Sequence, residues 1–222
     1  SSKSRNWAVW VLDYLSRYDP DPLRYFISAN MPETNDTDFS WADFIRRNND
    51  ELVATYGNLV NRVLTFTYRN FDGCVPHHGE FDSQSQALIK KAEDTFANVD
   101  NLLHGCHFRE ATRSAMSLAQ EANRYLDEKA PWKTIKEDKA AAATSLYVAM
   151  VVIAQLKTVF YPFLPFSSQK VHEYLGYEGK LEQYGWKWQD LPPGQKLMEP
   201  KALFVKLDKA VAEEETARLG QS

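Results

Sequence analysis

Residues 38–68 read DFSWADFIRRNNDELVATYGNLVNRVLTFTY, and this stretch decides the fold class. Its apolar residues recur at helical spacing and form one stripe: Trp41, Ile45, Leu52, Tyr56, Leu59, Val60, Val63 and Leu64. Asp38 precedes the stripe and is expected to be the N-cap, because its carboxylate can accept from the free backbone amides of the first turn. The stretch therefore predicts one long helix with a single buried face.

Further helices are predicted on the C-terminal side of this stretch. After an exposed loop at 70–82, residues 83–104 and 109–129 each present one apolar face, and residues 167–175 form a short helix after Pro165. The two longer faces comprise Leu88, Ala92, Phe96, Val99 and Leu103, and then Ala115, Leu118, Ala122 and Tyr125. Residues 137–161 are apolar nearly all round, which is typical of a central buried helix.

The two ends of the chain differ from this helical centre. Residues 7–17 predict a helix, after which Asp21 is expected to cap a second helix that has Pro22 at its first position and ends near Asn30. Residues 176–200 are rich in Gly and Pro, and residues 202–207 predict a strand. We therefore expect an all-α, antiparallel helix bundle over 38–175, with a connecting helical segment at 1–37 and a fold-back C-terminal extension at 176–222.

Composition narrows the class of protein. The 222 residues are 44% hydrophobic and 25% charged, with a net charge of -4, which excludes a disordered chain and a generally basic nucleic-acid-binding surface. Two cysteines are too few for a disulfide framework and favour a reducing, cytoplasmic location. The apolar run from Leu146 to Leu156 is too short to cross a bilayer, so no membrane partner is expected.

One cluster of side chains in the sequence could bind a metal ion. It comprises Cys74, His77, His78, His104, Cys106 and His107, which are thiol and imidazole ligands of the kind that zinc prefers. Its spacing fits no closed zinc site, and a loop and a helix end would place polar residues here in any case. The sequence leaves this question open, and no metal ligand is assigned.

Asn58 and Arg62 lie four residues apart on the long helix, on the side away from Leu59 and Val63. Two interpretations stay open at this point. The pair is either solvated, as exposed polar faces usually are, or it faces a ligand. An asparagine can hydrogen-bond to a base edge, and an arginine to a base or a phosphate.

Trp132 follows Pro131 at a break between helices and precedes Lys133, Lys136 and Lys139. A tryptophan is commonly part of a core. An exposed indole beside cations would instead suit stacking on an unpaired base. The sequence alone does not choose between a core role and a stacking role.

Several motifs, taken in order and spacing, resemble methionyl-tRNA synthetases, which are class I aminoacyl-tRNA synthetases. They are Ser2-Lys3-Ser4-Arg5, Asp21-Pro22-Leu23-Arg24-Tyr25, Ala29-Asn30-Met31-Pro32-Glu33-Thr34, Asp38-Phe39-Ser40-Trp41, Asn58-Leu59-Val60-Asn61-Arg62, Ala130-Pro131-Trp132 and Pro162-Phe163-Leu164-Pro165-Phe166-Ser167-Ser168. The first looks like the end of the Lys-Met-Ser-Lys-Ser signature. The resemblance covers nearly all of residues 2–207.

The resemblance implies a function for specific residues. Lys3 would help to hold the phosphates of ATP. Asn58, Arg62 and Trp132 match positions that recognise the CAU anticodon of tRNA(Met), where the tryptophan stacks on the first base, and Pro131 would fix the approach of Trp132. The expected function of this chain is anticodon recognition, and the expected partner is the anticodon loop.

The resemblance also implies that the nucleotide-binding domain, the methionine pocket and a zinc-bearing insertion precede residue 1. No catalytic residue is expected in this chain, which is predicted to be inactive alone, and ATP and zinc are expected of the full-length enzyme only. Without the catalytic domain, the Trp7 and Trp10 segment and Leu203–Leu207 are expected to lose their partners and become disordered or contact another chain.

Two alternatives remain. One is the anticodon domain of a related class I synthetase, for leucine, valine, isoleucine or cysteine. The other is a helical protein-interaction module with no RNA role, in which Trp132 belongs to the core and Asn58 and Arg62 are merely solvated.

Overall fold

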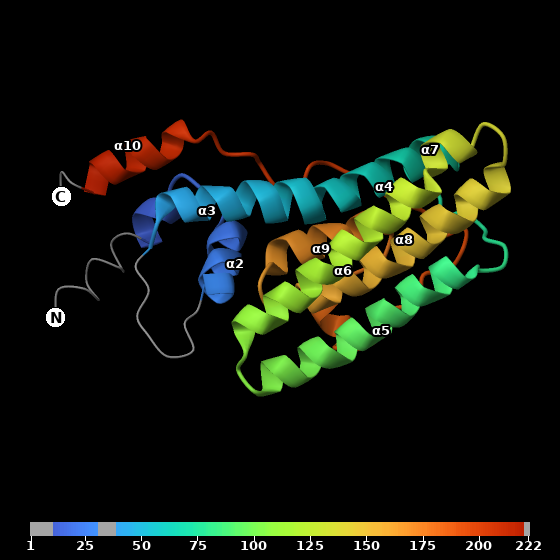
Figure 1. The fold of residues 1–222 in the computed structure, drawn as a ribbon, viewed down its shortest axis with the longest axis horizontal. Coiled ribbons are helices and arrows are strands. Elements are labelled where there is room, and N and C mark those ends of the chain that lie inside the picture. Colours follow the sequence, from blue (N-terminus) through green and yellow to red (C-terminus); the bar gives the residue numbers. More distant parts are fainter. Residues whose placement is uncertain (1–10, 31–38, 220–222) are drawn as a thin grey trace.

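The computed structural model describes residues 11–30 and 39–219, and the secondary structure of this part is helical (Figure 1). Residues 11–15 form a helical turn. The later elements are α2 (Pro20–Asn30), α3 (Trp41–Arg47), the π-helix η1 (Asn48–Gly57), α4 (Asn58–Asn70), α5 (Ser83–His104), α6 (Phe108–Lys129), α7 (Pro131–Thr134), α8 (Lys139–Val159), α9 (Pro165–Tyr174), the 3-10 helix η2 (Leu181–Tyr184) and α10 (Ala210–Leu219). The expected all-α fold is confirmed.

The long helix predicted over 38–68 is observed as α3, η1 and α4 in succession (Figure 1). All eight residues of its predicted stripe are buried. Asp38 lies outside the described residues, and the N-cap of α3 is Ser40, whose Oγ accepts from the Asp43 amide at 3.3 Å. The π-helical bonding of the middle segment was not predicted, because the spacing of its buried residues is compatible with an α-helix as well as with a π-helix.

The bundle itself consists of α4, α5, α6 and α8, which pack side by side (Figure 1). α8 is its central helix, and every residue from Val148 to Val159 is buried. α8 is 21 residues long and apolar enough to cross a membrane by length and composition, contrary to the shorter run expected from the sequence. Its burial among the other helices explains that composition without a membrane.

The start of α2 differs from the prediction. The helix begins at Pro20, so that Asp21 lies inside its first turn instead of capping it. The Asp21 carboxylate is buried and accepts a hydrogen bond of 2.7 Å from the backbone amide of Ser167, in the first turn of α9. Because Leu164, the N-cap residue of α9, makes no side-chain cap of its own, Asp21 caps that helix from a distant part of the chain.

The C-terminal extension packs against the long helix, so the expectation that Leu203–Leu207 lose their partners was wrong for Leu203 and Phe204, whereas Val205 is exposed. Leu203 and Phe204 are buried, and the segment is irregular instead of the predicted strand. A Cβ added at Gly57 would lie 2.7 Å from the Leu52 carbonyl oxygen and 3.1 Å from the ring of Phe204, which explains the glycine there.

Two asparagines at the start of η1 hold this segment by its backbone. The side-chain amide of Asn48 donates to the Val205 carbonyl at 2.9 Å. Asn49 donates to the Leu207 carbonyl at 2.7 Å and accepts from the Leu207 amide at 2.9 Å. The extension is therefore fixed by hydrogen bonds as well as by apolar burial.

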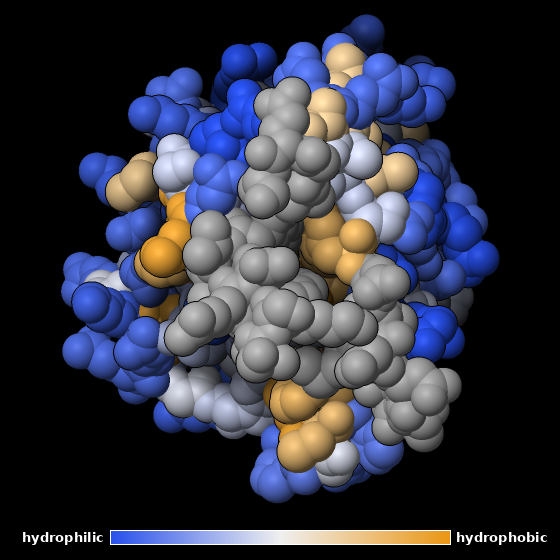
Figure 2. Space-filling view, turned by 90° about the vertical axis from the view of Figure 1, so that its left-hand side faces the viewer, coloured by the Kyte–Doolittle hydropathy of each residue, from blue (hydrophilic) through white to orange (hydrophobic). Residues whose placement is uncertain are grey.

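A second, smaller core lies at the end of the molecule where α2, α3 and α10 meet. Its aromatic members pack edge to face, as Trp41 does on Phe44 with 5.7 Å between ring centroids. Figure 2 shows apolar patches on this end. Leu12, Phe166 and Val205 are 72%, 61% and 73% exposed, so the described residues leave apolar surface uncovered. Trp7 and Trp10 lie outside the described residues.

Candidate functional site

Arg62 reaches from α4 across to α6 and is held there by three acceptors. Its guanidinium donates to the Asp127 carboxylate, the Asn123 side-chain oxygen and the Asn123 carbonyl, each at 2.9 Å. Asn123 is itself fixed by a hydrogen bond of 3.0 Å to the Thr55 carbonyl of η1. These contacts set the plane of the guanidinium, which is therefore pre-positioned and not free in solvent.

Trp132 lies against this guanidinium, with the Arg62 Cζ 5.0 Å from the centroid of its ring. The indole packs on the main core but is only partly buried. A cation at this distance from a tryptophan ring is attracted by its π system. The Trp132 side chain is thus packed on the core and in part accessible, and its stacking on a base stays a prediction.

The turn before Trp132 explains how the indole reaches Arg62. Ala130 adopts a left-handed conformation (φ 44°, ψ 59°), which is unusual for a residue with a Cβ. It ends α6, and the buried Pro131 starts α7 at the position where a proline fits best. This sharp change of direction places Trp132 beside the last turns of α6.

A charged contact beside this turn joins α6 to α5. Lys129 forms an ion pair with Asp82, the N-cap residue of α5. The Lys129 ammonium and the Ser85 amide lower the pKa of Asp82 to about 2. Asp82 is therefore ionised at neutral pH and helps to hold the end of α6 in place.

Asn58 begins α4, one turn before Arg62, and its side chain is exposed. Its side-chain amide makes no hydrogen bond with any residue in the described part of the chain. Residues four apart on a helix are neighbours on its surface. One surface is therefore bordered by the Asn58 amide, which has no hydrogen-bond partner among the described residues, the ordered Arg62 guanidinium and the Trp132 indole.

Asn123 and Asp127, which orient Arg62, were not predicted from the sequence. They lie four apart on α6, where they are polar exceptions near a strongly apolar face. That spacing was visible in the sequence, but which helix would face α4 was not. The three lysines after Trp132 are exposed as expected, and Lys139 lies 5.2 Å from the ring of Phe71.

The six cysteine and histidine residues of the predicted cluster are not brought together. Cys74, His77 and His78 precede α5, whereas His104, Cys106 and His107 follow or end it, and a helix of 22 residues spans about 33 Å. His78 instead stacks on Tyr147 with 4.2 Å between ring centroids. Within residues 11–30 and 39–219, no three His, Cys, Asp or Glu side chains are placed to share a metal ion.

Comparisons with known proteins identify the family of the chain. Residues 75–222 match the family model described as the anticodon binding domain of methionyl tRNA ligase, and residues 1–64 match the model of class I tRNA synthetases (M). The helix bundle is thus an anticodon-binding domain of a class I tRNA synthetase. The chain belongs to the methionyl-tRNA synthetase family.

Individual relatives support the same assignment. The chain is 60% identical over 219 residues to a methionine–tRNA ligase of Dehalococcoides mccartyi, and 46% identical over 244 residues to that of Roseiflexus castenholzii. These alignments cover 99% and 98% of this chain but 40% and 41% of the relatives, so the chain spans about 40% of their length. A crystal structure of apo Mycobacterium tuberculosis methionyl-tRNA synthetase superposes with a TM-score of 0.79 at 27% identity, covering 85% of this chain and 39% of that one.

Proposed function

We propose that the surface formed by Asn58, Arg62 and Trp132 binds the unpaired bases of a tRNA anticodon loop, with the sequence CAU of tRNA(Met). The observation that carries this proposal is the contact of the Arg62 guanidinium with the Trp132 indole, beside the free amide of Asn58. Single-stranded RNA is typically recognised by stacking on aromatic rings together with hydrogen bonds to base edges.

Each side chain has a distinct part in the proposed mechanism. Trp132 provides the stacking surface, and Pro131 fixes its approach through the turn at Ala130. Asn123 and Asp127 hold the Arg62 guanidinium, whose Nη1 retains one donor for a base or phosphate. Asn58 has both a donor and an acceptor available, which allows it to read a base edge. Pre-positioning of Arg62 reduces the entropy lost on binding.

A titration with an RNA hairpin tests the proposal. A hairpin with a CAU loop is expected to quench tryptophan fluorescence, and Trp132→Ala is expected to weaken its binding by about 10- to 100-fold, the cost of one lost base stack. Trp186→Phe is the matched control, because Trp186 packs on Phe96 of α5, away from this surface. Equal affinity of wild type and Trp132→Ala would refute the assignment.

The same titration addresses selectivity. Asn58→Ala is expected to reduce the preference for CAU over hairpins with other loops, since it removes hydrogen bonds to a base edge. Asn101→Ala, an exposed asparagine on α5, is expected to leave that preference unchanged. Hairpins carrying the anticodons for leucine, valine, isoleucine and cysteine test the related synthetases directly. A preference for one of these hairpins over the CAU hairpin would contradict the CAU assignment and favour the corresponding synthetase.

We further propose that this chain acts within a longer enzyme that joins methionine to tRNA(Met) with ATP, in the cytoplasm. Support comes from the relatives, which are methionine–tRNA ligases of greater length. Lys3, which lies outside the described residues, would contact the ATP phosphates, and zinc would be bound elsewhere in that enzyme. The exposed Leu12, Phe166 and Val205 suggest that the catalytic domain covers this end of the molecule (Figure 2).

A further inference from the structure

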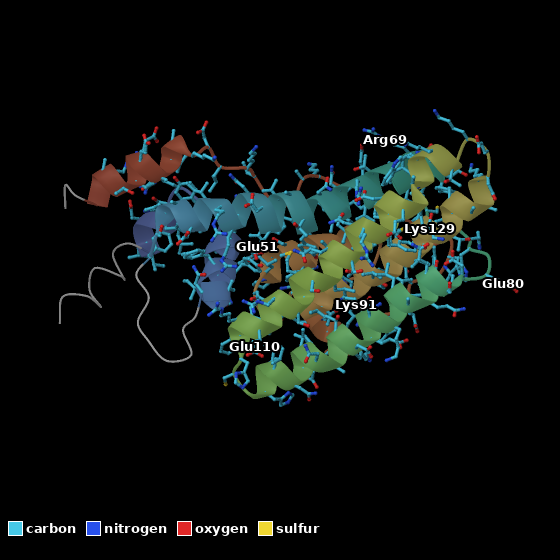
Figure 3. The ribbon with its side chains drawn as sticks, in the orientation of Figure 1. Glu51, Arg69, Glu80, Lys91, Glu110 and Lys129 are labelled. Carbon is cyan, nitrogen blue, oxygen red and sulfur yellow. The ribbon has the colours of Figure 1, made fainter. Side chains whose placement is uncertain are left out.

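A second polar site lies between the long helix and the opposite half of α6. It is a cavity of about 270 Å³ whose lining includes Arg47, Glu51, Arg109, Arg113 and Gln120. Figure 3 shows Glu51 on the long helix near the Glu110 end of α6, whereas Lys129 marks the end that carries the proposed anticodon site. The same two neighbouring helices therefore border both sites.

The charges of this cavity are not balanced. Arg47 is neutralised by Glu51, with a shortest contact of 3.0 Å, and also donates to Asn30. Arg109 and Arg113 are exposed and form no ion pair with a residue that the structure describes. Glu110 is adjacent in sequence but does not line the cavity. Two guanidinium groups are thus available to an external anion.

The two arginines lie in line with the residues that hold Arg62. One face of α6 carries a row of polar side chains, because their spacings of four, seven, three and four residues are close to whole helical turns. In order they are Arg109, Arg113, Gln120, Asn123 and Asp127. At 1.5 Å per residue, Arg113 and Arg109 are about 15 and 21 Å from Asn123 along the helix. One strand of an RNA stem covers that distance with several successive phosphates.

We propose that Arg109 and Arg113 bind phosphates of the RNA backbone that flanks the bases read at Trp132. This inference rests on the proposed function and extends it to the stem of the same hairpin. Guanidinium groups suit the task, because their paired donors match the oxygens of a phosphate. Such contacts position an RNA without reading its sequence.

The salt dependence of hairpin binding separates this role from base recognition. The double variant Arg109→Gln/Arg113→Gln is expected to bind hairpins with CAU and with a scrambled loop more weakly by the same factor. The slope of log K against log salt is expected to become shallower by about 1.5, the contribution of two phosphate contacts. Preference for CAU is expected to stay at the wild-type level.

A matched control removes the same charge elsewhere. Lys90→Gln/Arg124→Gln also lowers the net charge by two, but these exposed residues form ion pairs on or beside α5, with Asp94 and with Glu121. This variant is expected to keep nearly the wild-type slope. A slope equal in the two double variants would overturn the proposal, as would a loss of affinity confined to the CAU hairpin.

The measurements distinguish a failure of the proposed backbone contacts from a failure of the proposed anticodon recognition. If wild type prefers CAU and Trp132→Ala weakens binding while the arginine variant does not, only the backbone contacts are refuted. If wild type shows no preference among loops, the anticodon assignment fails first. A CAU trinucleotide, which has no stem, is expected to bind the wild type and the Arg109→Gln/Arg113→Gln variant equally. Unequal binding would contradict placement of the arginines on the stem.

Discussion

Lys157 is a buried lysine near the end of α8, and it has no carboxylate partner among the described residues. Its ammonium nitrogen lies 4.5 Å from the ring centroid of Tyr177 and makes no hydrogen bond there. Burial lowers the pKa of Lys157 to about 7. Burial and the nearby Lys157 also lower the pKa of His172 to about 4. Both groups therefore favour their neutral forms in the folded protein.

The buried Lys157 predicts that the free energy of unfolding rises with pH between about 7 and 9.5. In this window the unfolded chain, whose lysine has a pKa near 10.5, binds more protons than the folded chain. The slope is expected to reach at most about 1.4 kcal/mol per pH unit. Urea denaturation at several pH values measures it.

Lys157→Met is expected to lose this slope and to be more stable than wild type at pH 7, because no buried amine has to be neutralised. Lys170→Met, at an exposed lysine on α9, is expected to keep the slope. An unchanged slope in Lys157→Met would show that another group titrates in this range.

At the residue level, residue type and spacing left the roles of Arg62 and Trp132 open, and their assignment to a binding site came from the resemblance to methionyl-tRNA synthetases. The structure brings the two side chains into contact. Whether these residues bind an anticodon stays a prediction. The anchors on α6 and the burial of Lys157 depend on which helices pack together, and a single sequence does not reveal that packing.

At the scale of elements, the predicted helices of the bundle were confirmed within a few residues. α5 and α6, expected over 83–104 and 109–129, are Ser83–His104 and Phe108–Lys129. Their strong amphipathic pattern explains this success. Predictions of capping were less reliable, because a carboxylate can satisfy amides far away in sequence. Asp21 illustrates the point, since it caps α9 and not α2.

The cap provided by Asp21 predicts the effect of its removal. Asp21→Ala is expected to lower the free energy of unfolding by about 1–2 kcal/mol, the usual value of a helix N-cap. Asp21→Asn is expected to cost less, because its side-chain carbonyl can still accept from the Ser167 amide. Chemical denaturation measures both variants, and an Asp21→Ala protein as stable as wild type would contradict the role.

At the scale of the whole molecule, α10 and the segment before α2 meet through a buried carboxylate. Glu215 of α10 is 5% exposed, pairs with Arg17 at 2.7 Å and accepts from the Tyr18 hydroxyl at 3.0 Å. The sequence predicted a fold-back tail, but not these contacts, which join residues about 200 positions apart. Such long-range pairings leave no periodic pattern in a sequence.

The attachment of the tail predicts its resistance to proteolysis. Wild-type protein is expected to resist limited cleavage between residues 199 and 210, whereas Asn49→Ala is expected to be cleaved there several-fold faster. Loss of its two hydrogen bonds to Leu207 favours local opening by about 1–2 kcal/mol. Asn98→Ala, which loses a contact between α5 and α6, serves as the control. Equal cleavage of wild type and Asn49→Ala would contradict this attachment.

The π-helical η1 has a consequence for the register of the long helix. In a π-helix each carbonyl bonds five residues ahead instead of four, so the segment accommodates extra chain length without breaking the rod. Because a π-helix has more residues per turn than the 3.6 of an α-helix, each residue of Asn48–Gly57 turns the chain by less than the roughly 100° of an α-helical residue. The direction in which Asn58 and Arg62 point relative to Trp41 therefore depends on the π-helical bonding of the segment between them. The ten residues of η1 thus set the rotation about the helix axis between the part of the long helix in the small core and the part in the main core.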